Sequence, residues 1–221
     1  MTEALPMFPL NSVLFPGARV PLRVFEDRYT ALVRHLLTES DPARRLFGSV
    51  AIREGFEVGD HGSQSLHRVG CRLQLGDVEE TGDGGFTVVA TARDRIRLDG
   101  LETSGDFPVG QVEVLAENDV AVAPETVERV KSTFTAYRAT LAQISGDPYT
   151  GRLPHDPVML SWVLAATAPL PHPDRQRLLE ADDVAVRLDM VTDMLRSELR
   201  AMNAIPSLPA TDVARTGWSP N

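Results

Sequence analysis

Residues 5–29 read LPMFPLNSVLFPGARVPLRVFEDRY, and this stretch contains more information about the fold than any other part of the chain. Prolines at positions 6 and 9 interrupt its first apolar run. That run can form only an edge or bulged strand, because proline donates no hydrogen bond to a ladder. The Pro16-Gly17 pair suits a turn, and residues 20–24 alternate with the period of a strand that buries one face. The opening therefore predicts two short strands joined by a turn.

Further strands are predicted downstream of this opening. Residues 46–52 form an apolar run of strand length. Residues 69–75 and 86–92 alternate in hydropathy on either side of the turn sequence TGDGG at 81–85, which is typical of a β-hairpin. Residues 109–114 complete the strand-rich part of the chain.

Helical periodicity appears in four segments, namely 27–37, 127–144, 158–168 and 184–202. Asp156 is expected to cap the third helix, which starts with a proline, and Asp182 is expected to cap the fourth. The apolar stripe of the second helix suits an internal core or a dimer seam. We favour the core, because the apolar third helix needs partners. Strands followed by helices predict the α+β class.

The opening contains four short motifs, F-P-L at 8–10, F-P-G at 15–17, V-P-L at 20–22 and E-D-R-Y at 26–29. In this order they resemble the opening of the Lon protease N-terminal domain, a substrate-binding module. Residues 95–98 (RIRL) look like a strand motif of that family, and the apolar pattern from QRLLE at 176–180 onward looks like its helical stretch. The matches follow the family's order over about the first two hundred residues.

The resemblance implies a PUA-like β-barrel over residues 1–118, a helical bundle over 119–203 and a flexible, proline-rich tail over 204–221 that includes Trp218. It also implies recognition of polypeptide substrates or partner proteins, in a stand-alone form without the ATPase and peptidase domains of Lon. Such recognition needs an exposed apolar groove or an open strand edge, since an unfolded chain offers apolar side chains and unpaired amides.

The catalytic signatures of a complete Lon protease are missing from this sequence. ATP binding needs the loop G-x-x-x-x-G-K-[ST], and peptide cleavage needs a serine-lysine dyad. The chain has one lysine, Lys131, which is followed by Ser132, but Glu125 and Val130 occupy the glycine positions of the loop. The surrounding pattern also places Lys131 in the middle of a helix. We therefore predict a protein that does not act as an enzyme.

The sequence suggests neither a cofactor nor a metal. Cys71 is the only cysteine, which excludes an internal disulfide and a cysteine-based zinc cluster. A nucleophilic pair of Cys71 with His61 or His67 is conceivable, but a strand cysteine packed as a small hydrophobe beside loop histidines fits the pattern better. The histidines show no H-E-x-x-H spacing.

The formal net charge of −9 and the pI of about 5.0 argue against general attraction to nucleic acid. The chain shows no basic leader and no apolar run of membrane-spanning length, so we expect a cytoplasmic protein without a membrane partner. The oligomeric state stays open.

Seven residues are candidate peptide contacts, namely Met7, Phe8, Phe15, Pro21, Arg93, Arg95 and Arg97. The first four belong to the proline-rich opening, which is the expected binding region together with the crevice between barrel and bundle. The three arginines alternate along one strand, so they should form a positive stripe. That stripe suits an acidic peptide, RNA or a solvated, salt-bridged face, and it lacks aromatic residues for base stacking. RNA binding and small-ligand binding remain alternatives.

Overall fold

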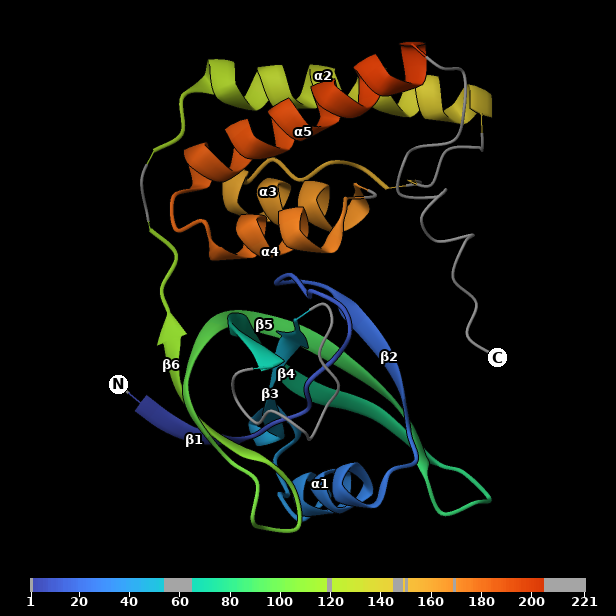
Figure 1. The fold of residues 1–221 in the computed structure, drawn as a ribbon, viewed down its shortest axis with the longest axis vertical. Coiled ribbons are helices and arrows are strands. Elements are labelled where there is room, and N and C mark those ends of the chain that lie inside the picture. The colour runs from blue at the N-terminus through green and yellow to red at the C-terminus, as the bar shows by residue number, and fades with distance from the viewer. Residues whose placement is uncertain are drawn as a thin grey trace. The chain divides into compact units, whose positions relative to one another are not determined.

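The computed structural model describes residues 2–53, 65–118, 121–144, 149, 151–168 and 170–204. The chain divides into two compact units, residues 1–116 and 117–221. The first unit contains a curled sheet and helix α1, and the described part of the second contains helices α2 to α5 (Figure 1). The α+β class is confirmed. The predicted tail, with Trp218, lies outside the described residues.

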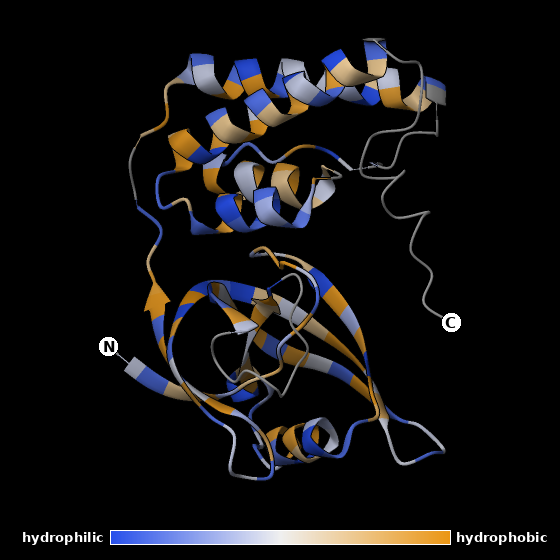
Figure 2. Cartoon of the chain, viewed as in Figure 1, coloured by the Kyte–Doolittle hydropathy of each residue, from blue (hydrophilic) through white to orange (hydrophobic). Residues whose placement is uncertain are grey.

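The sheet is antiparallel and has six strands in the described part of the chain. They are β1 (Thr2–Pro6), β2 (Arg19–Val24), β3 (Leu46–Ile52), β4 (Leu66–Glu80), β5 (Phe86–Glu102) and β6 (Val109–Leu115). Their order is β1-β6-β5-β4-β3, and β2 pairs with the first part of β5. Apolar and polar residues alternate along β2 and β5 (Figure 2), as expected for strands with one buried face.

The segment after β1 closes the sheet on itself. Strands β1 and β3 lie at opposite ends of the strand order, and parallel bridges join Met7 to Gly48 and Leu10 to Ala51. Only two isolated bridges form here because Pro9, which lies between them, has no N–H to donate. The prediction that the first apolar run can form only an edge or bulged strand is confirmed, because β1 lies at one end of the strand order.

Met7 lies at the centre of the core of the first unit, where its side chain is completely buried. The same cluster contains Leu5, Val50, Ile52, Leu66, Ile96, Leu98 and Val112. Two glycines make room for Met7: a Cβ on Gly48 would lie 2.5 Å from its Sδ, and a Cβ on Gly110 would lie 2.8 Å from its Cγ. The sheet therefore closes around a methionine from the opening segment.

The predicted hairpin is strands β4 and β5, which pair antiparallel. Gly84, in the turn between them, has a φ of +83°, a conformation that glycine adopts without a Cβ clash. Helix α1 (Asp27–Leu37) has the predicted bounds. Of its predicted apolar face, Tyr29, Leu32, Val33 and Leu36 are buried, whereas Leu37 is exposed. A short 3-10 helix (Pro42–Arg44) follows it.

The helices of the second unit are α2 (Pro124–Ile144), α3 (Pro157–Thr167), α4 (His172–Glu180) and α5 (Val184–Ala204). Helices α2 and α5 run side by side (Figure 1), and α3 also packs against α5. The stripe of α2 is buried within the unit at Val130, Phe134, Tyr137 and Leu141, so the interpretation of this stripe as internal core is confirmed.

The two predicted helix caps have different outcomes. Asp156 caps α3 as predicted, because its Oδ1 accepts a hydrogen bond from Met159 N–H at 2.8 Å. The prediction for α5 is wrong by one residue. Asp183 directly precedes the helix, and its Oδ1 accepts from Val186 N–H at 3.0 Å, so Asp183 is the cap and not Asp182. The sequence Asp-Asp offered two equivalent candidates, and only the start of the helix distinguishes them.

Candidate functional site

An apolar pocket of about 270 Å³ opens within the first unit. Its walls come from the opening segment, helix α1, the start of β4, the end of β5 and the connection from β5 to β6. The apolar and aromatic lining residues are Pro9, Tyr29, Leu66, Leu101, Phe107 and Pro108. Arg28, Ser65 and Thr103 add polar groups to this lining.

The closure of the sheet fixes two of these walls. Met7 N–H donates a hydrogen bond to the carbonyl oxygen of Pro108 at 2.8 Å, which ties the opening segment to the β5–β6 connection. Phe8 N–H donates to the carbonyl oxygen of Gly48 at 2.8 Å, directly before Pro9. Backbone hydrogen bonds therefore hold both proline walls of the pocket in place.

Tyr29 forms the wall on the side of α1. Its ring lies against Phe8, with ring centroids 4.2 Å apart, and the guanidinium carbon of Arg28 lies 4.8 Å from the Tyr29 centroid. Arg28 also forms an ion pair with Glu26 at 2.7 Å. Burial raises the pKa of the Tyr29 hydroxyl, although the Arg28 charge works in the opposite direction. The hydroxyl therefore stays protonated and neutral at physiological pH.

Phe107 forms another wall of the pocket. Its ring centroid lies 5.0 Å from that of His35, so α1 supports this side of the pocket as well. The volume of the pocket falls below the roughly 300–1,000 Å³ of typical small-molecule sites. Rigid apolar walls around a space of this size suit one large apolar side chain better than a whole cofactor.

The four predicted contacts of the opening segment lie in different environments. Met7 and Phe15 are fully buried, so in this structure neither offers a surface to a polypeptide. Phe8 is also buried, but it lies behind Tyr29 and so supports the pocket wall. Pro21 is exposed on β2 and does not line the pocket. None of these four residues lines the pocket, but Pro9, Arg28 and Tyr29 from residues 5–29 do.

The predicted arginine stripe is wrong at Arg95. Asp94 pairs with Arg72 and Ala92 pairs with Leu73, which leaves Arg93 as the extra residue of a β-bulge. A bulge shifts the alternation of side chains by one residue. Arg95 and Arg97 therefore face the same way as Ala92, and Arg93 faces the other way. On their shared face Arg95 is buried, whereas Arg97 is exposed, as is Arg93.

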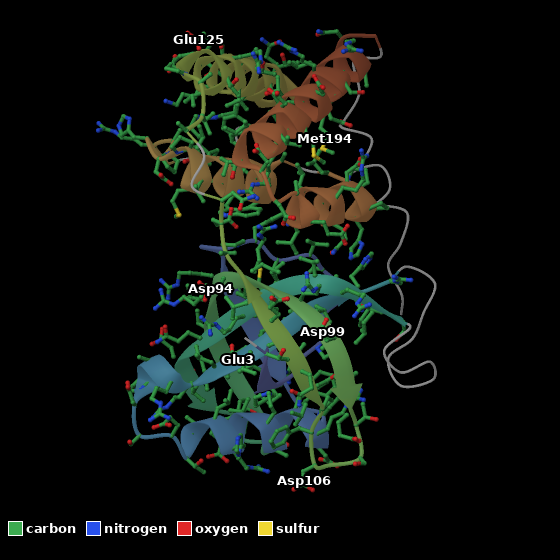
Figure 3. The ribbon with its side chains drawn as sticks, turned by 90° about the vertical axis from the view of Figure 1, so that its left-hand side faces the viewer. Glu3, Asp94, Asp99, Asp106, Glu125 and Met194 are labelled. Carbon is green, nitrogen blue, oxygen red and sulfur yellow. The ribbon has the colours of Figure 1, made fainter. Side chains whose placement is uncertain are left out.

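Carboxylates accompany Arg72 and Arg97, whereas the exposed Arg93 donates a hydrogen bond to Gln74 Oε1 at 2.9 Å. Arg72 forms ion pairs with Glu3 at 3.0 Å and with Asp94 at 2.6 Å, and Arg97 forms an ion pair with Glu113. Glu3 and Asp94 come from different strands of this sheet (Figure 3). A guanidinium group that is paired with a carboxylate is largely neutralised and attracts a phosphate only weakly. The observed face therefore fits a solvated, salt-bridged surface better than an RNA-binding surface.

None of the seven candidate contacts lines the pocket, and the lining residues that the sequence reasoning missed include Leu66, Leu101 and Phe107. Leu66 lies at the start of β4 and Leu101 lies near the end of β5. In the sequence, an apolar residue within a strand indicates core packing and gives no sign of a pocket. Phe107-Pro108 gave the one usable signal, because an aromatic residue beside proline is unusual in a polar turn such as TSGDFP at 103–108. Only sheet closure brings these distant residues together.

Residues 4–197 match the model of the family described as the ATP-dependent protease La (LON) substrate-binding domain. The chain belongs to this family. The match includes every apolar wall of the pocket and, up to residue 197, the four α-helices that the structure describes in the second unit. The resemblance carried by the opening motifs is thereby confirmed.

Curated relatives of this LON domain are Lon proteases. The chain is 25% identical to Lon protease 2 of Myxococcus xanthus over 97% of its own length and 26% of that protein. It is 27% identical to Lon protease 2 of Herpetosiphon aurantiacus over 90% of its own length and 24% of that protein. The chain thus spans about a quarter of the length of these relatives.

Solved structures show the same fold. A Lon N-terminal domain protein from Xanthomonas campestris matches with a TM-score of 0.64 and 26% identity, covering 86% of this chain and 98% of that one. The N-terminal domain of a Mycobacterium avium complex Lon protease matches with a TM-score of 0.61 and 17% identity, covering 88% and 98%. The second likeness concerns the fold alone.

Lys131 and Cys71, which the sequence analysis considered as possible catalytic residues, both have contacts within the fold. Lys131 lies within α2, and its Nζ is 3.6 Å from Glu128 Oε1. Cys71 is buried in β4, and its Sγ lies 3.4 Å from the carbonyl oxygen of Leu14, whereas His61 lies outside the described residues.

Within the described ranges, no cluster of three His, Cys, Asp or Glu side chains could hold a metal ion. Among the helices that the structure describes, none has both the length and the apolar character to span a bilayer.

Proposed function

We propose that this protein recognises polypeptides without catalysing their cleavage, and that the pocket of the first unit holds a large apolar side chain of the bound chain. Membership of the LON substrate-binding family is the observation that carries the proposal. The pocket supports it because its six apolar and aromatic walls offer the surroundings that an exposed leucine or phenylalanine of an unfolded chain lacks in water.

The expected affinity follows from the size of the pocket. Full burial of one large apolar side chain contributes about 1.5–3 kcal/mol, which alone gives a weak complex. Loss of translational freedom on binding opposes it further. Tight capture therefore requires several contacts along the same polypeptide, each weak and tolerant of sequence. Such tolerance suits a protein that selects unfolded chains over one particular motif.

The finer assignments belong to this proposal as well. We infer that the closed sheet is a PUA-like barrel ending near residue 118 and that residues 119–203 form a helical bundle. The two parallel bridges after β1 and the packing of α2 and α3 on α5 support these assignments. Cytoplasmic location and action on polypeptide substrates or partner proteins stay predictions.

Two phenylalanines allow a matched test of the pocket. Phe107 lines it, whereas Phe25 is 69% exposed and does not. We expect Phe107→Ala to weaken binding of a fluorescently labelled unfolded polypeptide by about five- to tenfold, because one aromatic contact of roughly 1 kcal/mol or more is lost. Equilibrium titration followed by fluorescence anisotropy measures this change, and circular dichroism checks that each variant is folded.

The Phe25→Ala variant should bind with the affinity of the unmodified protein, although it removes the same side chain from a more exposed place. Equal weakening by both variants would show that general surface hydrophobicity, and not the pocket, determines binding. Absence of saturable binding by the unmodified protein at concentrations well above micromolar would remove the proposal.

A further inference from the structure

A second pocket, of about 340 Å³, lies wholly within the second unit between α4 and the middle of α5. Its apolar part comes from Met190 and Met194 on α5 and from Leu170, which precedes α4. Met194 lies on the side of α5 that faces α4 (Figure 3). Methionine side chains are flexible and polarizable, so they adapt to aliphatic groups of different shape.

Carboxylates form the rest of this lining. Asp174 comes from α4, and Asp193 and Glu198 come from α5, whereas Arg177 is the one basic residue of the lining. The lining therefore carries three formal negative charges against one positive charge, a net charge of −2. Arg177 forms an ion pair with Asp174 at 3.3 Å, and Arg196 forms a longer one with Asp193 at 3.8 Å.

Glu198 differs from the two aspartates. Its Oε2 is buried and has no hydrogen-bond partner among the residues that the structure describes. Burial, and secondly the nearby Asp174 carboxylate, raise the pKa of Glu198 because both disfavour its charged form. A buried carboxylate oxygen without a donor is costly, and a cation brought into the pocket would relieve that cost.

We propose that this pocket binds a cationic group on an aliphatic stem, the chemistry shared by lysine side chains and free alkyl diamines. The stem would lie along Met190 and Met194, and the cation would lie among Asp174, Asp193 and Glu198. Long cationic side chains commonly bury their methylene groups on apolar surface while the charged end keeps polar contacts. The methionines of the pocket suit the aliphatic stem of such a ligand, and the carboxylates suit its cationic end.

Other ligand classes fit the pocket less well. An anion would meet a net negative lining. A divalent metal would need a compact set of ligands, and no group of three His, Cys, Asp or Glu side chains in the described part of the chain is arranged to hold one. A purely apolar ligand would bury carboxylates without compensation.

Methionine methyl groups provide a direct test on the full chain. The protein has six methionines, and Met7, buried in the first unit, serves as an internal control. We expect 1,5-diaminopentane to shift the ¹³C-methyl NMR signals of Met190 and Met194 in a saturable way and to leave that of Met7 in place. Contacts with partly exposed carboxylates are weak, so a Kd on the order of 1 mM is expected.

Charge variants and a neutral analogue make the test specific. Glu198→Gln keeps the shape of the side chain, and we expect it to raise the Kd by about fivefold, because one charge contact of roughly 1 kcal/mol is lost. Asp106→Asn, at an exposed position of the first unit, changes the net charge equally and should leave the Kd unchanged. An equal effect of the two variants would overturn the proposal.

Two lysine-like probes distinguish the source of the cation. N-acetyl-lysine methylamide presents the side chain as a polypeptide would, and its norleucine counterpart lacks the ammonium group. Binding of the lysine compound assigns a polypeptide side chain, whereas binding of the diamine alone assigns a free amine. Equal binding of the norleucine compound, or unmoved Met190 and Met194 signals with every cation, would overturn the proposal whatever the outcome for the first pocket.

Discussion

Arg187 is completely buried in the second unit, where it joins three segments of the chain. Its guanidinium group donates to Ser161 Oγ on α3 at 2.9 Å, to the carbonyl oxygen of Ala181 at 2.7 Å and to Glu117 Oε2 at 2.8 Å. The guanidinium carbon also lies 3.4 Å from the centroid of the Trp162 ring. Arginine suits this place because its planar group donates several hydrogen bonds while stacking on an aromatic face.

Replacement of Arg187 tests this role. We expect Arg187→Ala to lower the free energy of unfolding by about 3 kcal/mol, because removing one member of a buried ion pair leaves its partners without compensation. Urea unfolding followed by Trp162 fluorescence, in a Trp218→Phe background, measures the change. Arg196→Ala, which removes an exposed arginine of the same helix, should cost less than about 0.5 kcal/mol. Equal losses would contradict the account.

At the scale of elements, the start of α5 depends on one carboxylate. Asp183 directly precedes the helix and accepts a hydrogen bond from Val186 N–H, which satisfies one of the four N–H groups without a partner inside the helix. The same backbone position places Arg187 one turn into the helix, with its N–H bonded to the carbonyl oxygen of Asp183 at 2.9 Å. Correct capping therefore also sets the position of the buried arginine.

The cap leads to a prediction about stability. Asp183→Ala should lower the free energy of unfolding by about 1 kcal/mol. Asp183→Ser should lower it much less, because the serine hydroxyl also accepts the capping hydrogen bond. Thermal or urea unfolding of both variants provides the measurement. If serine were as destabilising as alanine, the contribution of Asp183 would lie elsewhere than in the cap.

Elements with a strong period could be predicted from the sequence, and local irregularities could not. The β4–β5 hairpin and the α2 stripe repeat over many residues, so single exceptions do not hide the pattern. The bulge at Arg93 was missed because arginine continues to alternate through Arg95 and Arg97 in the sequence, while the strand shifts by one residue. That shift turns Arg93 away from Arg95 and Arg97, and no residue type in the sequence indicates it.

At the scale of the whole molecule, the family could be identified from the sequence, whereas the pocket could not. The opening motifs preserve an order that the family match confirms over residues 4–197. The pocket instead combines Pro9, Tyr29, Leu66, Leu101 and Phe107, which are far apart along the chain. They meet only because the segment after β1 bridges to β3 and closes the sheet. No short stretch of the sequence therefore indicates the pocket, because the pocket forms only when the sheet closes.

The most direct measurement of the central claim is an amide NMR titration of the full chain with an unfolded polypeptide. The account predicts saturable shift changes at Tyr29, Leu101 and Phe107, which the Phe107→Ala variant weakens and the Phe25→Ala variant leaves in place. Saturable changes confined to residues 117–204, with the amides of the first pocket unmoved, would contradict it.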